Sequence, residues 1–302
     1  MISVTGSNGF IGTNLIKELS CCNEDVSLIV DKDKNELIDK FHQYPVGRFN
    51  ASTDFYNSLV NSNTVIHLAG LAHTGKSDRF DEINHLVTKK LAEDAVKAGV
   101  KNFIYISSIG VLGDKAKEPF TESSKPNPLN DYALSKLNAE QSIIEICKRS
   151  CMNYVIIRPP LVYGKGAPGN FGKLLKLINN KTILPFKGLN AKRTLCSIDN
   201  LIDFIMKCIN QPEAANQIFL VSDKQDVKTS DLIKKLTEYS GNNNYLLNVS
   251  ERILVTLAVL AGKKSSIEKL VNPLLIDSSF AREKLAWEPP LSADEGLKKI
   301  FI

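Results

Sequence analysis

The sequence predicts an α/β protein built on a doubly wound parallel sheet, followed by a smaller, mostly helical C-terminal lobe. Short apolar runs rich in β-branched residues alternate with longer stretches of helical periodicity. This alternation is typical of a parallel sheet with helices on both faces, whose strands read as continuous apolar runs. Two further observations support the prediction: three glycines directly follow the first run, and the regular alternation of strands and helices ends after Pro159-Pro160.

The elements follow in a regular order along the first 221 residues. The predicted strands cover residues 2–5, 26–30, 64–68, 103–107, 154–158 and 218–221. The predicted helices cover residues 10–19, 55–60, 80–98, 130–148 and 199–209. Gly99 stands directly after the third helix, where a glycine commonly ends a helix.

A domain boundary is expected near residue 164. Residues 164–172 form a loop with four glycines and a proline, and beyond it the strand pattern appears only in pieces, as in TILPF and QIFLVS. We therefore assign residues 1–164 to the larger domain and residues 165–302 to the lobe, and expect residues 198–221 to return to the main sheet.

Composition narrows the class of protein. The 302 residues carry a net charge of +5 with scattered lysines, which argues against a nucleic-acid partner. The first strand leaves no room for a signal peptide, and the longest apolar run, residues 253–261, is too short to span a membrane, so a cytoplasmic protein is expected. The six cysteines lack metal-ligand spacing, and no metal site is expected.

The glycine loop predicts a dinucleotide-binding, Rossmann-like domain. In TGSNGFIG, Gly6 permits a tight turn, Gly9 lets a diphosphate approach the backbone, and Gly12 lets the helix pack on the strand. The cofactor contacts expected from this loop are Gly6, Asn8, Gly9, Phe10, Ile11 and Gly12. Asp31, after the second strand, suits the ribose hydroxyls of NAD, whereas Lys32 and Lys34 leave NADP as the alternative.

A second pattern, DYALSK, predicts acid–base chemistry. Tyr132 and Lys136 are four residues apart and share one face of a helix. An ammonium near a phenol favours the phenolate, so we expect Lys136 to lower the pKa of Tyr132 and make it a usable proton donor or acceptor. Ser107 and Ser108 end the strand FIYISS, at the sheet edge where ligands of parallel sheets collect.

Seven motifs in order resemble the extended short-chain dehydrogenase/reductases of the nucleotide-sugar epimerase/dehydratase group. They are TGSNGFIG, VIHLAG, Asn84 within EINHLVTKKLAEDA, YISSIGVLG, DYALSK, IRPPLVYG and AREKLAWEPPLSADEGL. The resemblance implies that Ser108 holds the reacting oxygen, that Tyr132 is the acid/base, and that Lys136 lowers its pKa and binds the nicotinamide ribose.

The resemblance also implies contacts outside the catalytic set. Further cofactor contacts are implied for Asn50, which replaces a common adenine-binding aspartate, and for Leu68, Ala69, Gly70, Asn84 and Pro159. In the lobe, Asn170 resembles an asparagine that meets the nucleoside diphosphate, and Arg193 stands where the family has a phosphate-binding arginine. Arg282 is either a second substrate contact or a solvated helix charge.

The resemblance leaves several reactions open. Ile109-Gly110 follows Ser108 where dehydratases have an Asp-Glu pair, so dehydration is not expected. SSIGVLG, together with RPPLVYG, GNFGKLLKLI and LPF, resembles bacterial reductases, which implies 4-keto reduction of a UDP-4-keto-6-deoxy-N-acetylhexosamine in surface-polysaccharide biosynthesis. Asp31 suits the tightly held NAD of a UDP-glucose or UDP-N-acetylglucosamine 4-epimerase, which is the alternative. A dinucleotide-binding sensor without turnover is the third hypothesis.

Two expectations concern partners. Relatives often dimerise through the two longest helices, here residues 80–98 and 130–148, so a homodimer is expected. Residues 253–261, flanked by Arg252 and Lys263-Lys264, are interpreted as a packed helix of the lobe, with weak association with a membrane surface as the alternative.

Overall fold

Seven parallel strands form one sheet, which confirms the predicted parallel sheet and adds β3 to the six predicted strands. The computed structural model describes residues 1–22, 24–31, 41–72, 79–116, 118–180, 183–242 and 244–302. The strand order is β3-β2-β1-β4-β5-β6-β9, and every pairing is parallel. The strands are β1 (Ile2–Thr5), β2 (Val26–Val30), β3 (His42–Pro45), β4 (Thr64–His67), β5 (Asn102–Ile106), β6 (Asn153–Arg158) and β9 (Gln217–Leu220). The chain order reverses between β1 and β4, where open α/β sheets bind ligands.

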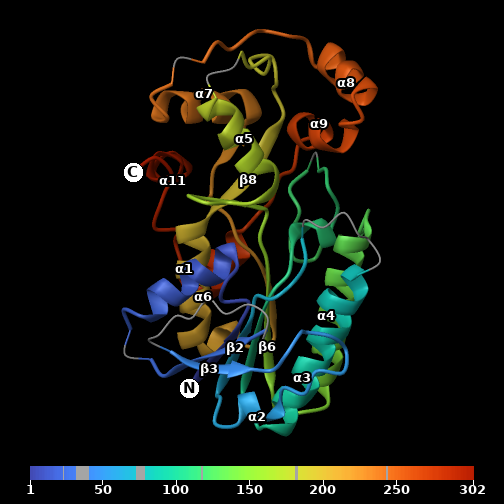
Figure 1. Cartoon of the computed structure of the whole chain (residues 1–302), viewed down its shortest axis with the longest axis vertical. Helices are drawn as coiled ribbons and strands as arrows, with labels where there is room; N and C mark the ends of the chain where they lie inside the picture. The colour runs from blue at the N-terminus through green and yellow to red at the C-terminus, as the bar shows by residue number, and fades with distance from the viewer. Residues whose placement is uncertain (23, 32–40, 73–78, 117, 181–182, 243) are drawn as a thin grey trace.

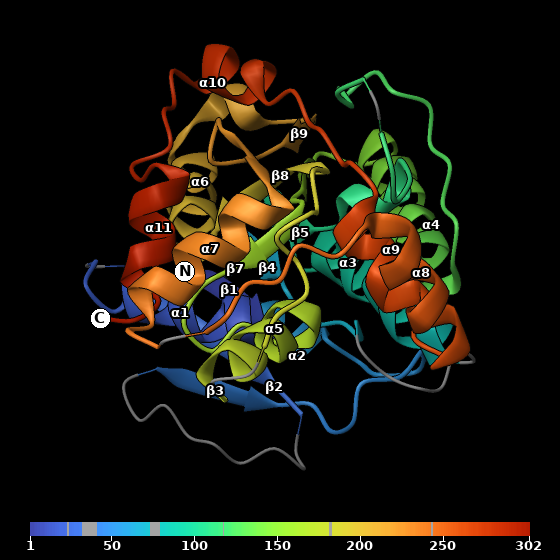
Figure 2. The ribbon, with the colours of Figure 1, turned by 90° about the horizontal axis from the view of Figure 1, so that it is seen from above.

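Helices cover both faces of this sheet (Figures 1 and 2). One face packs on α1 (Phe10–Leu19), α6 (Ile198–Asn210) and α10 (Ser279–Leu285). The other packs on α2 (Tyr56–Leu59), α3 (Val87–Lys97) and α4 (Asp131–Lys148). Because neighbouring strand residues face opposite sides, Ile104 belongs to the first core and Phe103 to the second.

The helix expected over residues 80–98 is not α-helical throughout. Asp81–Leu86 form a π-helical turn, and α3 starts only at Val87. The end is as predicted: Gly99 has φ +78°, and the amide of Val100 donates to the Ala95 carbonyl at 3.0 Å.

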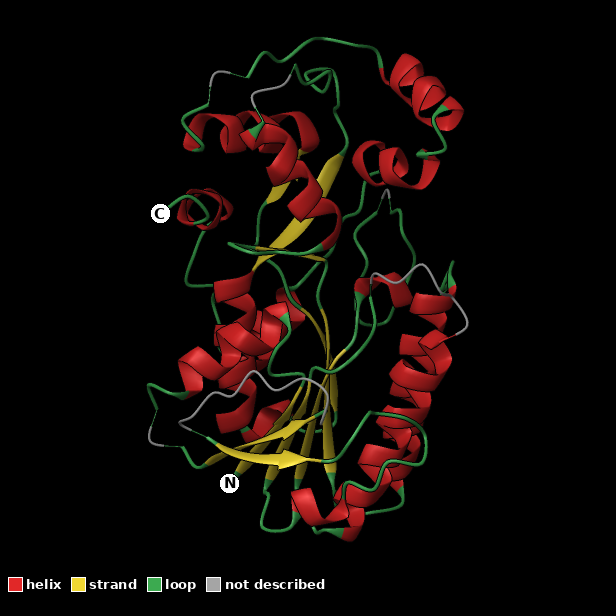
Figure 3. Cartoon of the chain, in the orientation of Figure 1, coloured by secondary structure: helices red, strands yellow, loops and turns green. Residues whose placement is uncertain are grey.

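A second, smaller sheet lies in the C-terminal part of the chain (Figure 3). It joins β10 (Asp226–Lys228), β8 (Lys192–Ser197) and β7 (Leu161–Tyr163), in that order. The helices of this region are α5 (Gly169–Asn179), α7 (Thr229–Tyr239), α8 (Glu251–Leu260), α9 (Lys264–Val271) and α11 (Ala293–Lys299). In the TILPF segment, a predicted strand piece, Leu184 makes a single isolated bridge to Leu246 instead. Among the described residues, no helix combines the length and apolar character that crossing a bilayer requires.

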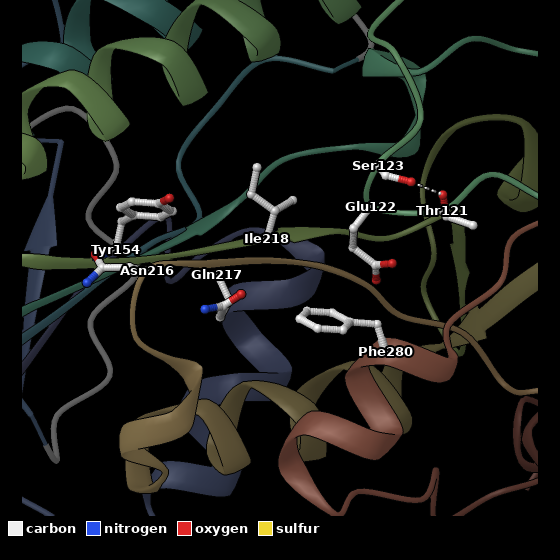
Figure 4. A pocket seen from close by; sticks show the side chains of 8 residues that line it. All are labelled: Thr121, Glu122, Ser123, Tyr154, Asn216, Gln217, Ile218 and Phe280. Atoms are coloured by element: carbon white, nitrogen blue, oxygen red, sulfur yellow. Dashed lines mark hydrogen bonds between the residues drawn. The ribbon is translucent and has the colours of Figure 1, made fainter.

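The free edge of the main sheet is partly closed by a side chain. A hollow runs along β9 (Figure 4), and the Glu122 carboxylate in it accepts the backbone N–H of Leu220 at 2.9 Å. Burial raises the pKa of Glu122. The lining of the hollow contains none of the predicted site residues. The hydrogen bond from Leu220 to Glu122 occupies a backbone amide that an edge strand would otherwise expose. The lining residues are Thr121, Glu122, Ser123, Tyr154, Asn216, Gln217, Ile218 and Phe280.

Candidate active site

The three glycines of the first loop have different structural reasons. Gly6 has φ +74°, and a Cβ built on it would lie 2.5 Å from the backbone nitrogen of Ala69. A Cβ on Gly12 would lie 2.1 Å from the Gly6 carbonyl oxygen. A Cβ on Gly9 would meet that oxygen at 3.3 Å and, apart from its chain neighbours, no other atom of the described residues within 4 Å. Packing therefore requires the outer two glycines, whereas Gly9 borders open space.

That open space lies at the start of α1. Gly9 is the N-cap of the helix and carries no side chain to bond the first amides, and the first turn contains no acidic residue. Its uncapped N–H groups therefore suit an anion. Phe10 and Ile11 are half-buried against the core, while Asn8 is exposed beside Gly9.

Asp31 and Asn50, the two residues predicted to bind the adenosine half, lie in different surroundings. Asp31 directly follows β2 and is half-buried. Lys32 and Lys34 lie outside the described residues. The Asn50 side chain closes its own turn: its Oδ1 accepts from the backbone amide of Ser52 at 2.9 Å, and its Nδ2 donates to the Arg48 carbonyl at 2.9 Å. Its role toward adenine stays a prediction.

The segment after β4 reaches α4, the helix that carries Tyr132 and Lys136. Leu68 and Ala69 are half-buried, and Gly70 is exposed. A Cβ on Gly70 would lie 3.0 Å from Asn84 Oδ1 and 3.5 Å from Lys136 Nζ. The structure thus brings the ends of the first and fourth strands to the same edge as Lys136.

Asn84 holds this segment in place. Its amide accepts from the backbone N–H of Leu71 at 2.7 Å and donates to the Leu71 carbonyl at 3.0 Å and to Ser135 Oγ at 3.1 Å. The side chain is fully buried within the π-helical turn. These bonds give Asn84 a positioning role that the motif alone did not reveal.

Ser108 and Tyr132 face each other at the carboxyl end of β5. Ser108 caps the short turn Ile109–Val111, and its Oγ accepts the Gly110 N–H at 3.1 Å. Pro159 supports this turn, because its carbonyl accepts the amide of Ile109 at 3.0 Å. The Tyr132 ring packs edge-on against Phe80, with 5.9 Å between ring centroids.

The expected pKa of Tyr132 is wrong in direction. Burial raises the pKa of Tyr132, and hydrogen bonding with Ser108 offsets this in part. Lys136 Nζ donates to the Ile106 carbonyl at 2.9 Å and lies 4.6 Å from the centroid of the Tyr105 ring. Desolvation therefore outweighs the charge effect expected from the i, i+4 spacing.

Lys136 itself is buried and surrounded by groups that the sequence did not single out. Burial lowers its pKa to about 8, and the negative charge of Glu140 opposes this. Glu140, one helical turn further, pairs with Arg158 through bonds of 3.0 and 2.6 Å. The His67 ring stacks on Tyr105 at 5.6 Å, and burial lowers the pKa of His67 to about 3. The i, i+4 spacing of Lys136 and Glu140 is the sequence signal that could have indicated that Glu140 lies near Lys136.

The lobe residues predicted to bind substrate lie on three elements. Asn170 is half-buried in the first turn of α5. Arg193 on β8 donates from Nη1 to the Asn272 carbonyl at 2.8 Å, and burial lowers its pKa to about 10. Arg282 on α10 donates to Ser278 Oγ at 3.0 Å, and α10 packs on the face of the sheet opposite α4. The part of these residues in substrate binding stays a prediction.

Known proteins share the fold and the motifs along most of the chain. Residues 2–222 match the NAD dependent epimerase/dehydratase family. A UDP-glucose 4-epimerase of Vibrio cholerae is 38% identical over 99% of this chain and 93% of its own. A dTDP-4-dehydro-6-deoxyglucose reductase of Escherichia coli is 26% identical over 99% of this chain and 96% of its own. The solved structure of a UDP-glucose 4-epimerase from Thermotoga maritima with UDP-glucose, 23% identical, superposes with a TM-score of 0.80, covering 99% of this chain and 97% of that one.

Proposed function

Because the chain belongs to the NAD-dependent epimerase/dehydratase family, we propose that it transfers hydride at C4 of a UDP-linked sugar. The observation that carries this proposal is the meeting of Ser108, Tyr132 and Lys136 at one edge of the sheet. The open glycine loop of Gly9 lies at the same edge. An acid/base, an oxygen-binding hydroxyl and a dinucleotide cradle are the groups that such a transfer needs.

The residues at this edge fit a nicotinamide dinucleotide. The diphosphate would lie on the uncapped amides behind Gly9, and the ribose of the adenosine half on Asp31. Gly70 and Lys136 would contact the nicotinamide half. When bound, the nicotinamide would supply the hydride acceptor or donor of the reaction. The buried Ser107 Oγ at this edge has no partner among the described residues, as expected of a group that meets a ligand.

The finer proposal is 4-keto reduction of a UDP-4-keto-6-deoxy-N-acetylhexosamine for surface polysaccharide. A phenol has an ordinary pKa of about 10 and burial raises the pKa of Tyr132 further, so at neutral pH it carries the proton that a reductase must donate. As hydride reaches C4, the carbonyl π bond breaks and the Tyr132 proton passes to O4, leaving a phenolate that regains its proton from solvent. Ser108 holds O4 during this transfer.

Epimerisation at C4 is the second candidate. It is favoured by the 38% identity with the Vibrio cholerae UDP-glucose 4-epimerase along almost the whole chain. In that reaction Tyr132 must first accept the O4 proton as a base, and it returns the proton after the keto-sugar has turned over. The protonated phenol fits the reduction better, whereas the carboxylate of Asp31 suits an NAD that is retained through the cycle.

One assay separates these functions. The purified protein is mixed with reduced dinucleotide and the UDP-4-keto sugar, and absorbance of the reduced nicotinamide is followed. Loss of that band in excess over enzyme supports the reductase. Conversion of UDP-N-acetylglucosamine to UDP-N-acetylgalactosamine without net loss of the band supports the epimerase instead. Dinucleotide binding without either turnover would contradict both and leave the sensor hypothesis.

A further inference from the structure

Helix α8 exposes an apolar face that its own lobe does not cover. Leu254 is buried against Leu189 and Ile267, which anchors the helix. Ile253, Leu257 and Leu260, however, are 53%, 57% and 80% exposed. Their spacing of four and three residues places them on one side of the helix, which we call the α8 face. An exposed apolar face of this kind marks an interaction site.

The part of the chain that leads into α8 is rich in exposed apolar side chains. More than half of the exposed large apolar side chains in the described part of the chain lie between residues 177 and 260. Tyr245 and Leu247 precede α8, and the amide of Leu247 donates to Leu184, next to the exposed Ile183. Figure 1 shows α8 at the outer end of the lobe, at the opposite end of the molecule from α2, and both views show α9 beside α8.

The charges around the α8 face are mainly basic. Arg252 at the start of the helix and Lys263 after its end are exposed. Lys264 pairs with Glu268 at 3.8 Å, and Glu251 lies at the first position of α8. Arg252 and Lys263 lie at opposite ends of α8, so antiparallel packing of two copies would bring Arg252 of one copy toward Lys263 of the other. Anionic lipid headgroups would attract them instead.

We propose that the α8 face docks on the surface of an anionic lipid bilayer, with Ile253, Leu257 and Leu260 in the headgroup–acyl boundary and Arg252 and Lys263 at the headgroups. A short amphipathic helix with apolar side chains on one side and basic residues at its flanks lies in the interface plane without spanning the bilayer.

Docking of this face orients the rest of the lobe. Helix α9 packs on α8, and Asn272, the residue after α9, accepts the hydrogen bond of Arg193. The docked helix pair is thus joined to the strand that carries the arginine predicted to bind phosphate. The bilayer would hold the sugar-binding lobe, rather than the dinucleotide-binding sheet, against its surface.

The test is flotation of the full chain with vesicles. Binding to vesicles of equal parts phosphatidylglycerol and phosphatidylcholine is compared with binding to pure phosphatidylcholine. We expect the wild type to partition at least about tenfold more strongly to the anionic vesicles. The double variant Leu257→Gln/Leu260→Gln should lose at least about tenfold in partitioning. Arg252→Gln/Lys263→Gln should lose about tenfold on anionic vesicles alone.

A matched control is Tyr56→Ser, which changes a 42% exposed side chain on α2 and should leave flotation unchanged. Turnover on soluble substrate without vesicles should be equal in all variants, which shows that they are folded and keeps this test separate from that of the reaction. Absence of wild-type flotation, or full flotation of the Leu257→Gln/Leu260→Gln variant, would overturn the proposal. Sedimentation velocity that shows a dimer lost in this variant would assign the face to a second copy and would also overturn it.

Discussion

The Lys136 ammonium donates a 2.9 Å hydrogen bond to the carbonyl oxygen of Ile106, the last residue of β5. The bond joins α4 to the strand that leads into Ser108, so the segments that carry Tyr132 and Ser108 are held by the same buried contact. Lys136 therefore acts on the geometry of the candidate site, while burial raises the pKa of Tyr132.

Tyr132→Phe should abolish turnover without loss of dinucleotide binding. The variant lacks the hydroxyl that moves the proton but keeps the ring that packs on Phe80. We expect the turnover number to fall by about 10²–10⁴-fold, the usual contribution of general acid–base catalysis. Titration of reduced-nicotinamide fluorescence measures binding separately. Near-full activity would exclude the proposed role of this residue.

Lys136→Met should stabilise the fold near neutral pH. Burial lowers the pKa of Lys136 to about 8, below its value of 10.5 in the unfolded chain. Between these values the unfolded state binds more protons, so the free energy of unfolding of the wild type rises with pH. The variant should be more stable by about 2 kcal/mol at pH 7, and this advantage should shrink between pH 8 and 10.5.

Urea unfolding at several pH values checks this prediction. Lys148→Met, which changes an exposed lysine on the same helix, is the matched control and should show no such difference. A Lys136→Met variant that is less stable than the wild type at pH 7 would mean that the bond to Ile106 outweighs the cost of burying the charge.

Glu140→Gln should destabilise the protein far more than Glu145→Gln. Both glutamates lie on α4 and pair with an arginine, but the Glu140–Arg158 pair is 1% and 4% exposed and the Glu145–Arg149 pair 62% and 78%. Loss of one charge leaves Arg158 unpaired in the core, at a cost of about 3 kcal/mol. The exposed pair is worth less than about 0.5 kcal/mol. Equal changes in the urea midpoint of the two variants would contradict the prediction that the buried Glu140–Arg158 pair matters more for stability than the exposed Glu145–Arg149 pair.

Gly12→Ala and Gly9→Ala should separate folding from binding. A Cβ at position 12 would overlap the Gly6 carbonyl oxygen, so the free energy of unfolding should fall by at least about 1–3 kcal/mol. Gly9 has φ −77°, which alanine adopts freely, so its replacement should cost less than about 1 kcal/mol. Gly9→Ala should nevertheless weaken dinucleotide binding, because its Cβ projects where the diphosphate would lie. Calorimetric melting and binding titration give the two quantities.

Asp31→Ala should weaken NAD binding more than NADP binding. The carboxylate accepts hydrogen bonds from ribose hydroxyls and repels a 2′-phosphate. Its removal should therefore weaken NAD binding through the lost hydrogen bonds and remove the repulsion that opposes NADP binding. Titration with both reduced dinucleotides measures the ratio of dissociation constants. Equal weakening would show that Asp31 does not decide between the two cofactors.

Local patterns of the sequence determined the fold class and located most of the candidate site at the edge of the sheet. Apolar runs with helical stretches between them predicted β1, β2, β4, β5, β6 and β9, because strands buried on both faces are continuous in sequence. The glycine spacing located the start of α1, and the i, i+4 spacing placed Tyr132 and Lys136 on one helix. Each of these features depends on residues within a few positions of one another.

Tertiary structure decided what depends on contacts between distant segments. The edge strand β3 has the polar sequence HQYP, and β10 has three residues, so neither carries an apolar signal. The direction of the Lys136 ammonium and the pKa of Tyr132 follow from burial against β5, and the exposure of α8 follows from which side of the helix meets α9 and Leu189. Periodicity states which residues share a face, but desolvation and partner choice are set only when that face meets another element.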